Sequence, residues 1–508
     1  MKGVVAAGHP LTLEAGAATL RAGGNAVDAA VASVLMSFVA ESPLTGPGAG
    51  GFMLVHTAGG ENHLLDFFIA APGRGDGDRK PAELTPIDIY FSDDAVQRFN
   101  VGPSSVGAYG TPAGLAQALE RFGTMPMDRL TAGPARAARE GVEVVPAQAF
   151  LFEVLSPIMA SSPESRELYA PGGRLLRAGD TIHLPDLGDL LERLGVEGPA
   201  YLYAGETAEA ICDWVLDRGG LLTPEDLSSY EVVEREPARV EFREREVLTN
   251  PPPSSGGILI ADALGILERL DQPHDAGVVA EVIASTNRAR DADFLKGLGS
   301  DGYLERFLAH EALDTVATEV RSRLGNTTHI SVMDAAGGCV SVTCSNGSCS
   351  GVVVPGTGMH LNNMLGEQDL NPLGFHLHEP GARVPSMMAP TLVLRDGRAE
   401  VALGSAGSNR IRSAVLQTIL AVVDQGMTAE EAVANPRLHV EGREVDAEPG
   451  VDPAALDRLV DSGRWTVRQW EEQNLYFGGV QAVARNLETG VLSGGGDPRR
   501  GGAAEVVG

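Results

Sequence analysis

Leu324-Gly-Asn-Thr-Thr-His-Ile-Ser-Val332 is the stretch that decides the fold, because the character of the chain changes there. A Gly-Asn pair ahead of two threonines is typical of a tight turn before a strand. The residues before it, from about Pro112 to Leu324, are mostly helical in pattern, whereas strand-like runs dominate after residue 326. By itself the stretch predicts only a turn, so its meaning depends on the segments around it.

Downstream of this stretch, the pattern predicts two pairs of strands and one long helix. Thr328–Asp334 and Cys339–Ser345 alternate around a glycine-rich turn and predict a hairpin. Thr391–Arg395 and Ala399–Leu403 predict a second pair, and residues 409–425 predict a helix. Strands with helices outside them indicate a layered α/β or α+β fold.

Upstream, the first seventy residues predict two helices and a hairpin. Thr12 is placed to cap a helix over Leu13–Arg21, and the alanine-rich run Ala26–Val39 predicts the next helix. Phe52–His56 and His63–Phe68 then predict two antiparallel strands.

The composition of the chain argues against nucleic-acid-binding and membrane proteins. The chain has 508 residues, 43% of them hydrophobic, which is ample for a buried core. Lysine plus arginine is 39 against 68 acids, a net charge of −29, which disfavours nucleic-acid and membrane-surface partners. The N-terminus lacks a signal-peptide apolar core, and the longest uncharged apolar run, Ala29–Ala40, is shorter than the ~20 residues that span a bilayer. We therefore expect a cytoplasmic protein.

The cysteines predict neither disulfides nor a metal site. Four cysteines are too few for a disulfide framework. On a strand, Cys344 would face away from Cys339 and Cys349, which argues against a three-cysteine site. We interpret these three and Cys212 as small buried hydrophobic residues.

Three short motifs resemble a phosphate-binding loop, a nucleophile elbow and a metal site, but the residues around each motif do not fit that site. Gly46–Gly51 opens a strand, whereas a phosphate loop opens a helix and carries a Lys-Ser or Lys-Thr pair. Gly347–Gly351 resembles a nucleophile elbow, but a strand-like run follows where a helix is needed. His376 and His378 would share one face of a strand, but no third metal ligand can be named, so no metal is predicted.

Seven separated segments occur together and in order, and together they resemble the γ-glutamyltranspeptidase family of N-terminal nucleophile hydrolases. The resemblance runs from Ala7 to the end of the chain. The segments that carry it are Gly23-Gly-Asn-Ala-Val-Asp-Ala-Ala30, Gly46-Pro-Gly-Ala-Gly-Gly51, Asn326-Thr-Thr-His329, Leu361-Asn-Asn363, Pro385-Ser-Met-Met-Ala-Pro-Thr391, Gly404-Ser-Ala-Gly-Ser-Asn-Arg410 and Asp497-Pro-Arg-Arg-Gly501.

The resemblance implies an α+β fold, a four-layer αββα sandwich, made as a precursor that cuts itself between Asn326 and Thr327. Residues 1–326 would form a large chain and residues 327–508 a small chain, both within one intertwined unit. Cleavage frees the α-amino group of Thr327, whose ordinary pKa of ~7.7–8.0 suits a general base. Thr327 would then take an acyl group from an amide and pass it to water or an amine.

Other site residues carry over by position. The resemblance implies that the Ser345 hydroxyl supports the nucleophile and that the backbone amides of Gly407 and Ser408 form an oxyanion hole. Glu367, Ser386 and Asn346 are the substrate-binding residues that it implies.

The chain departs from the family on substrate recognition. Phe68 stands where glutathione-cleaving members have an arginine that holds a carboxylate, and an aromatic ring cannot replace a guanidinium. Met364 and Met387 replace polar residues, and Asn346 is displaced by one position. Three arginines could supply a relocated anchor, and the sequence does not choose among them: Arg383, Arg410 and Arg412.

These observations predict a cofactor-free, self-processing amidohydrolase similar to γ-glutamyltranspeptidases, with a role in glutathione metabolism. The alternative within the same fold is an acylase or small-amide hydrolase acting on glutaryl- or oxamate-type amides. An unprocessed scaffold protein and a metal hydrolase rank lower. The predicted partners are a small amide or peptide substrate and the two chains of one precursor, and a dimer of the processed unit is left open.

Overall fold

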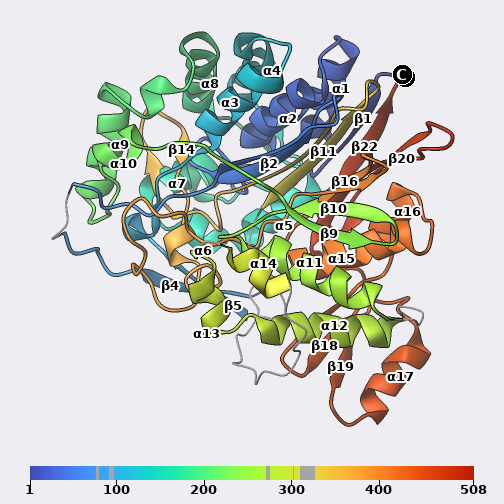
Figure 1. The fold of residues 1–508 in the computed structure, drawn as a ribbon. Helices are drawn as coiled ribbons and strands as arrows, with labels where there is room; N and C mark the ends of the chain where they lie inside the picture. The colour runs from blue at the N-terminus through green and yellow to red at the C-terminus, as the bar shows by residue number, and fades with distance from the viewer. Residues whose placement is uncertain (76–78, 91–95, 271–274, 301, 309–326) are drawn as a thin grey trace.

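Two antiparallel sheets lie face to face in the computed structural model, which describes residues 1–75, 79–90, 96–270, 275–300, 302–308 and 327–508 (Figure 1). The first sheet has, in spatial order, β22 (Ala503–Val507), β1 (Gly3–Ala7), β11 (Thr328–Asp334), β12 (Cys339–Ser345), β2 (Gly50–His56), β3 (Asn62–Phe67) and β8 (Val233–Arg235). The second has β21 (Leu492–Gly496), β20 (Gly479–Arg485), β16 (Arg398–Ala406), β15 (Thr391–Arg395), β10 (Arg245–Thr249) and β9 (Ala238–Phe242). Strands β11 and β12 contact β16 across the interface.

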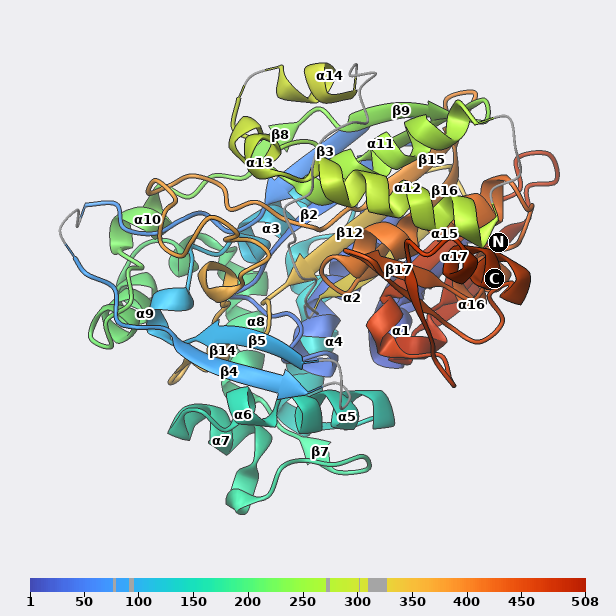
Figure 2. The ribbon, with the colours of Figure 1, turned by 90° about the horizontal axis from the view of Figure 1, so that it is seen from below.

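Helices cover the outer face of each sheet. On the first sheet, α1 (Pro10–Arg21) contacts β1, and α2 (Ala26–Ala40) contacts β11 and β12. On the second, α15 (Arg410–Val423) contacts β16, and α11 (Ser255–Glu268) contacts β9 and β10. Figure 2 shows α12 (Ala276–Ala289) beside α11 on that outer side. These layers confirm the predicted α+β, four-layer αββα sandwich.

The remaining elements flank the layers. Further helices of the described residues are α3 (Thr111–Phe122), α4 (Met127–Glu140), α5 (Pro146–Val154), α6 (Ser156–Met159), α7 (Pro163–Tyr169), α8 (Pro185–Glu197), α9 (Glu206–Leu216), α10 (Pro224–Ser228), α13 (Ala292–Gly297), α14 (Tyr303–Leu308), α16 (Ala429–Ala434) and α17 (Pro453–Asp461). Small sheets are formed by β4 (Thr85–Tyr90) with β5 (Val96–Val101), β6 (Val142–Glu143) with β7 (Thr181–Ile182), β13 (Val353–Val354) with β14 (Met359–His360), and β17 (Leu438–Glu441), β18 (Glu444–Ala447) and β19 (Thr466–Gln469).

The predicted hairpins, the long helices and the mostly helical middle of the chain are confirmed, and the predicted helix cap is wrong. The cap of α1 is His9, whose ring accepts a hydrogen bond from the Leu11 amide, while Thr12 lies inside the helix. The mostly helical middle of the chain also contains β8, β9 and β10. Strands β8 and β9 are sheet edges with charged, mostly exposed or half-buried side chains, so their pattern lacks the apolar alternation of a buried strand.

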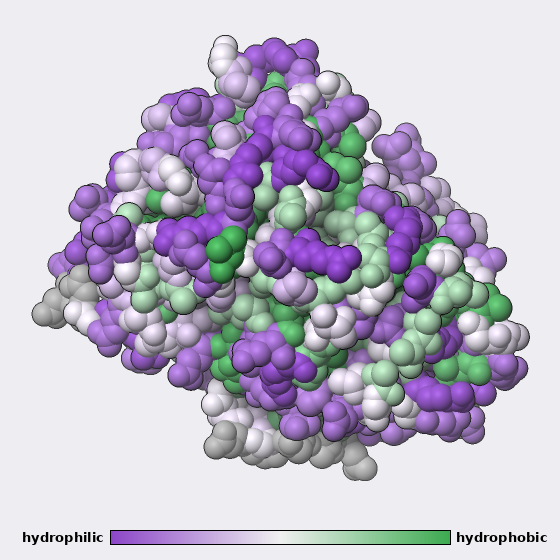
Figure 3. Space-filling view, turned by 90° about the horizontal axis from the view of Figure 1, so that it is seen from above, coloured by the Kyte–Doolittle hydropathy of each residue, from purple (hydrophilic) through white to green (hydrophobic). Residues whose placement is uncertain are grey.

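The polarity of the surface and the burial of the cysteines agree with what the composition predicts. Figure 3 shows a face that is mostly hydrophilic, with hydrophobic residues in smaller groups. Within the described ranges, no helix is both long and apolar enough to cross a membrane. All four cysteines are buried and free, as their interpretation as small hydrophobic residues predicts.

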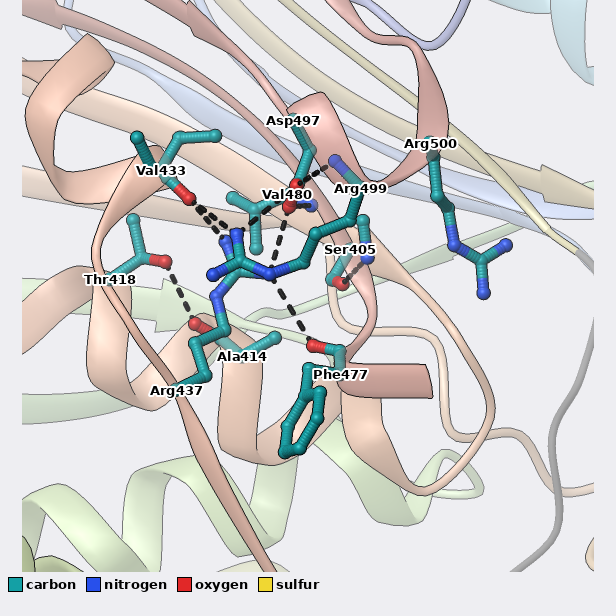
Figure 4. Close-up of polar contacts among 12 residues, drawn as sticks. Ser405, Ala414, Thr418, Val433, Arg437, Phe477, Val480, Asp497, Arg499 and Arg500 are labelled. Atoms are coloured by element: carbon teal, nitrogen blue, oxygen red, sulfur yellow. Dashed lines mark hydrogen bonds and ion pairs between the residues drawn. The ribbon is translucent and has the colours of Figure 1, made fainter. Parts of the chain in front are cut away.

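A buried ion network ties the segment before β22 to the second sheet (Figure 4). The Asp497 carboxylate accepts hydrogen bonds from Arg437 Nη1 at 2.8 Å, Arg499 Nη1 at 3.2 Å and the Val480 amide at 2.7 Å. Arg499 also forms a bidentate pair with Glu448, at 2.7 and 2.5 Å. Burial opposes ionisation, but Arg437 and Arg499 hold the pKa of Asp497 below its ordinary value. Both carboxylates are therefore matched by guanidinium groups.

We expect Asp497→Asn to lower the free energy of unfolding by about 3–5 kcal/mol, because it leaves buried guanidinium charge uncompensated. The measurement is urea unfolding followed by tryptophan fluorescence. Asp396→Asn is the matched control, because Asp396 is exposed in the β15–β16 turn. Equal midpoints for the two variants would contradict the importance of the network.

Candidate active site

Thr327 lies directly before β11, a strand that is paired on both sides. Strand β11 pairs with β1 and with β12, and the register sets Thr328 opposite Cys344. The next opposed position therefore brings together Thr327 and Ser345. Thr327 is buried, with 5% of its surface exposed. The other half of the predicted cleavage junction, Asn326, lies outside the described residues.

Ser345 ends β12 and lies between two strands of the same sheet. It pairs with Gly50 of β2, and its Oγ accepts a hydrogen bond from the Gly347 amide at 2.8 Å. Strand pairing thus sets Ser345 opposite Thr327, and whether its hydroxyl supports the nucleophile stays a prediction.

The predicted oxyanion loop joins β16 to α15. Gly407 has a φ of 123° and Ser408 a φ of 52°, both in the region that favours glycine. The Ser408 hydroxyl donates to Asp369 Oδ2 at 2.6 Å, which offsets part of the cost of that backbone conformation. The loop precedes the N-terminus of α15, where backbone amides and the helix dipole favour negative charge.

A buried carboxyl group that sequence reasoning missed holds the start of β11. Glu41, at the end of α2, accepts hydrogen bonds from Thr12 Oγ1 at 2.6 Å and Thr328 Oγ1 at 2.5 Å. Burial raises the pKa of Glu41 above its ordinary value, although the two hydroxyls favour the ionised form. The available signal in the sequence was an acidic residue that directly follows the uncharged apolar run Ala29–Ala40.

His329 fills the space between the sheets behind Thr327. Its ring nitrogens lie 2.8 Å from Thr343 Oγ1 and 3.0 Å from Ser331 Oγ. Burial lowers the pKa of His329 to about 3, so the ring is neutral at physiological pH. A Cβ on Gly404 of β16 would collide with this ring, so the sheets approach closely only with glycine there.

Phe68 does not face an open anion site. Its ring is buried and stacks on Phe52, with ring centroids 5.3 Å apart. The neighbouring Asp66 carboxylate pairs with Arg235 at 2.7 Å and with Arg383 at 3.3 Å. Arg383 is therefore engaged by a carboxylate of the protein itself, which weakens it as a relocated substrate anchor.

Glu367 lies beside the oxyanion loop. It is buried, and burial together with Asp369 raises its pKa to about 8. Among the described residues, Glu367 Oε1 has no hydrogen-bond partner. Asp369, whose charge acts on Glu367, in turn accepts a hydrogen bond from the Ser408 hydroxyl of the loop.

Asn346 and Ser386, the other predicted substrate residues, take part in backbone contacts. Asn346 Nδ2 donates to the His360 carbonyl at 3.1 Å. The Ser386 hydroxyl accepts from the Met388 amide at 3.0 Å, and its carbonyl accepts from Ser254 Oγ at 3.0 Å. These contacts fix the loops around the site, and whether either side chain contacts substrate stays a prediction.

Arg410 and Arg412 remain candidate anchors at the start of α15. The Arg410 guanidinium lies 4.2 Å from the centre of the Tyr476 ring, and Arg412 Nη1 donates to Asn287 Oδ1 at 2.7 Å. Burial, with Arg290 nearby, lowers the pKa of Arg412 to about 10. Arg412 therefore stays charged at neutral pH.

His376 and His378 do not converge. The first lies 2.9 Å from the Ser104 carbonyl and the second 3.1 Å from Asn371 Oδ1. The segment is made of turns, so the strand argument for a shared face is wrong. Among the described residues, no group of three or more His, Cys, Asp and Glu could hold a metal ion.

A cavity of about 240 Å³ opens beside Thr327. Its walls come from both sheets, from α5 and from the loop before β20. The lining residues are Gly8, Glu41, Leu44, Ala147, Phe150, Leu151, Thr327, Thr328, His329, Ala406, Gln473, Asn474, Leu475, Gly479, Gln481, Arg499 and Arg500. Ala406, one residue before the oxyanion loop, connects this cavity to that loop.

Comparison with known proteins gives concordant matches over nearly the whole chain. The sequence profile described as Gamma-glutamyltranspeptidase matches residues 12–507. The chain is 33% identical to the acylase ACY 1 proenzyme of Pseudomonas sp. (strain V22), over 97% of this chain and 91% of that protein. It is 31% identical to the glutathione hydrolase proenzyme of Bacillus subtilis (strain 168), over 99% and 91% respectively. The crystal structure of cephalosporin acylase from Bacillus halodurans matches with a TM-score of 0.83 and 26% identity, covering 99% of this chain and 95% of that one.

We expect Thr328→Val to lower the free energy of unfolding by about 1.5–3 kcal/mol, because Glu41 loses a hydroxyl donor in a buried site. Thr328→Ser keeps the donor and should stay close to the unchanged protein. The free energies of unfolding of both variants are measured by urea unfolding at pH 7. Equal losses of stability in Thr328→Val and Thr328→Ser would show that the hydrogen bond contributes nothing.

Proposed function

Because this chain belongs to the γ-glutamyltranspeptidase family, we propose that it is a self-processing amidohydrolase whose nucleophile is Thr327. The observation that carries the proposal is the placement of this residue. Thr327 lies at the start of a central strand, opposite Ser345 and beside a cavity that adjoins the oxyanion loop. Relatives of the chain are named as proenzymes, which supports processing of a precursor.

In the processing step, Thr327 Oγ attacks the carbonyl carbon of Asn326. The Oγ proton passes to the amide nitrogen as the peptide C–N bond breaks, which leaves an ester. Water then hydrolyses that ester, giving a carboxylate at Asn326 and a free α-amino group on Thr327. The products are residues 1–326 and 327–508, and both contribute strands to both sheets.

In the catalytic cycle, the freed amino group takes the proton of Thr327 Oγ as the oxygen attacks a substrate amide. Ser345 supports the hydroxyl, and the amides of Gly407 and Ser408 stabilise the negative charge on the carbonyl oxygen. The amine product leaves with the proton. Water or a second amine then takes the acyl group from Thr327.

The surroundings of Phe68 favour an acyl donor other than a plain γ-glutamyl group. A buried phenyl ring stacked on Phe52 offers no charge to a carboxylate, and Arg383 already pairs with Asp66. The acylase alternative therefore gains support, with glutaryl-type amides as donors to test beside γ-glutamyl amides and glutathione. The cytoplasmic location, the role in glutathione metabolism and the dimer remain predictions from the sequence.

Intact mass of the purified protein tests the nucleophile. We expect fragments ending at Asn326 and starting at Thr327, and an uncut chain for Thr327→Ala, which lacks the attacking oxygen. Thr327→Ser is the matched control, because it keeps a hydroxyl and should still cut, more slowly. A Thr327→Ala chain that cuts at the same junction would overturn the proposal.

The pH dependence of donor choice tests Glu367. γ-Glutamyl and glutaryl anilides differ only in the α-ammonium group, which an ionised Glu367 would hold. Since the pKa of this carboxyl is raised to about 8, the fraction ionised increases with pH. The ratio of kcat/KM for γ-glutamyl over glutaryl anilide should therefore rise from pH 6.5 to 8.5.

Glu367→Gln should make this ratio independent of pH, because glutamine carries no titrating charge. Glu379→Gln is the matched control, since Glu379 is exposed. An unchanged pH profile in Glu367→Gln would exclude Glu367 as the ammonium site.

A further inference from the structure

The sheet order divides the surroundings of Thr327 into two sides. Strands β12, β2 and β3 lie on one side of β11, and they lead to Ser345 and Phe68. Strands β1 and β22 lie on the other side. The cavity beside Thr327 belongs to this second side, because Gly8 follows β1 and Arg500 lies shortly before β22. It is therefore separate from the residues implied to bind the acyl group.

Arg500 brings unused hydrogen-bond donors to this cavity. Its Nη2 donates to the Leu475 carbonyl at 3.4 Å, a long bond. Its Nε and Nη1 are buried and have no hydrogen-bond partner among the described residues. Figure 4 shows the Arg500 side chain extending away from the Asp497 network. A buried guanidinium with idle donors is costly unless a ligand satisfies it.

Donors without a partner are not confined to Arg500: among the described residues, Arg410 Nε and Nη1 are also buried without one, but Arg410 does not line this cavity. Arg437 Nη2 donates to the Val433 carbonyl at 2.8 Å, and its Nη1 pairs with Asp497. Arg499 also lines the cavity, but it is bound by Glu448 and Asp497. Of the two arginines that line the cavity, Arg500 is thus the one with donors that have no partner among the described residues.

The backbone around Arg500 brings it to the reacting centre. A Cβ on Gly479 would collide with Arg500 Cδ, so the side chain depends on a glycine there. A Cβ on Gly407 would lie 3.5 Å from Arg500 Nη2, which places the guanidinium next to the oxyanion loop. Burial lowers the pKa of Arg500 to about 10, so it stays charged at neutral pH.

The rest of the cavity suits an amphipathic group. Leu44, Ala147, Phe150 and Leu151 form apolar walls. Glu41 also lines the cavity, but both of its oxygens accept threonine hydroxyls. A ligand with an apolar body and one carboxylate would match these walls and the free guanidinium.

We propose that Arg500 binds a carboxylate on the amine half of the substrate, the half that leaves when Thr327 takes the acyl group. The inference rests on the proposed function and names its leaving-group class: amines that carry a carboxylate, such as amino acids and aminobenzoates. In acyl transfer, Arg500 would also bind the carboxylate of the incoming amine.

The test compares 4-aminobenzoate with 4-aminobenzamide, which has nearly the same shape and no charge. Calorimetric titration of the purified processed protein should show the benzoate binding about tenfold or more tightly. Arg500→Met should remove this preference and Arg500→Lys should retain part of it. Arg398→Met, which changes an exposed arginine on β16, is the matched control and should bind like the unchanged protein.

A turnover measurement adds a second readout. N-glutaryl and N-γ-glutamyl derivatives of both amines are compared, and Arg500→Met should lower the kcat/KM ratio of benzoate over benzamide leaving groups about tenfold or more. Equal binding of the two amines, or a preference that survives Arg500→Met, overturns the proposal. If Arg500→Met fails to fold, the unchanged protein and Arg500→Lys still decide it. A chain that never cuts would instead contradict the proposed function, and intact mass reports that separately.

Discussion

The site depends on one constraint: β11 is a central strand, hydrogen-bonded along both edges, and Thr327 is the residue just before it. Pairing with β1 on one side and β12 on the other fixes the register of this strand, and pairing with β12 together with the hydrogen bond from Thr328 to Glu41 holds its start. The pairing with β1 connects residues 3–7 with residues 330–334. Two chains produced by cleavage before Thr327 would therefore stay joined through the sheets, without a covalent link.

Near the C-terminus, neighbouring buried charged residues have two different roles, one in an ion network and one beside the cavity. Asp497 and Arg499 complete an ion network that ties this segment to β20 and to Arg437. The next residue, Arg500, extends away from this network, and two of its nitrogens have no partner within the part of the chain that the structure describes. The network thus holds the backbone that presents Arg500 to the cavity, so the structural arginines and the proposed binding arginine depend on one another.

Much of the fold could be predicted because its signals are local. The β11–β12 hairpin and helices α2 and α15 follow from alternation, helical periodicity and turn residues. The predictions failed where another part of the chain decides the outcome. Thr12 looked like a cap, but it serves the distant Glu41, and the charged edge strands β8 and β9 are strands only because a neighbour pairs with them. The strand predicted for His376 and His378 failed in the same way.

The sequence by itself determined the family, the layered fold and the hairpin that follows Thr327, since the order of motifs and the alternation of residues can be read along the chain. Only the tertiary structure decided which arginines pair with carboxylates of the protein and which keep donors that a ligand can use. Arg383, Arg410, Arg412 and Arg500 are equivalent as letters, but Asp66 neutralises the first, and Arg500 reaches a cavity with idle donors. Charge and hydrogen bonding depend on distances between residues far apart in sequence, and only the packed sheets set those distances.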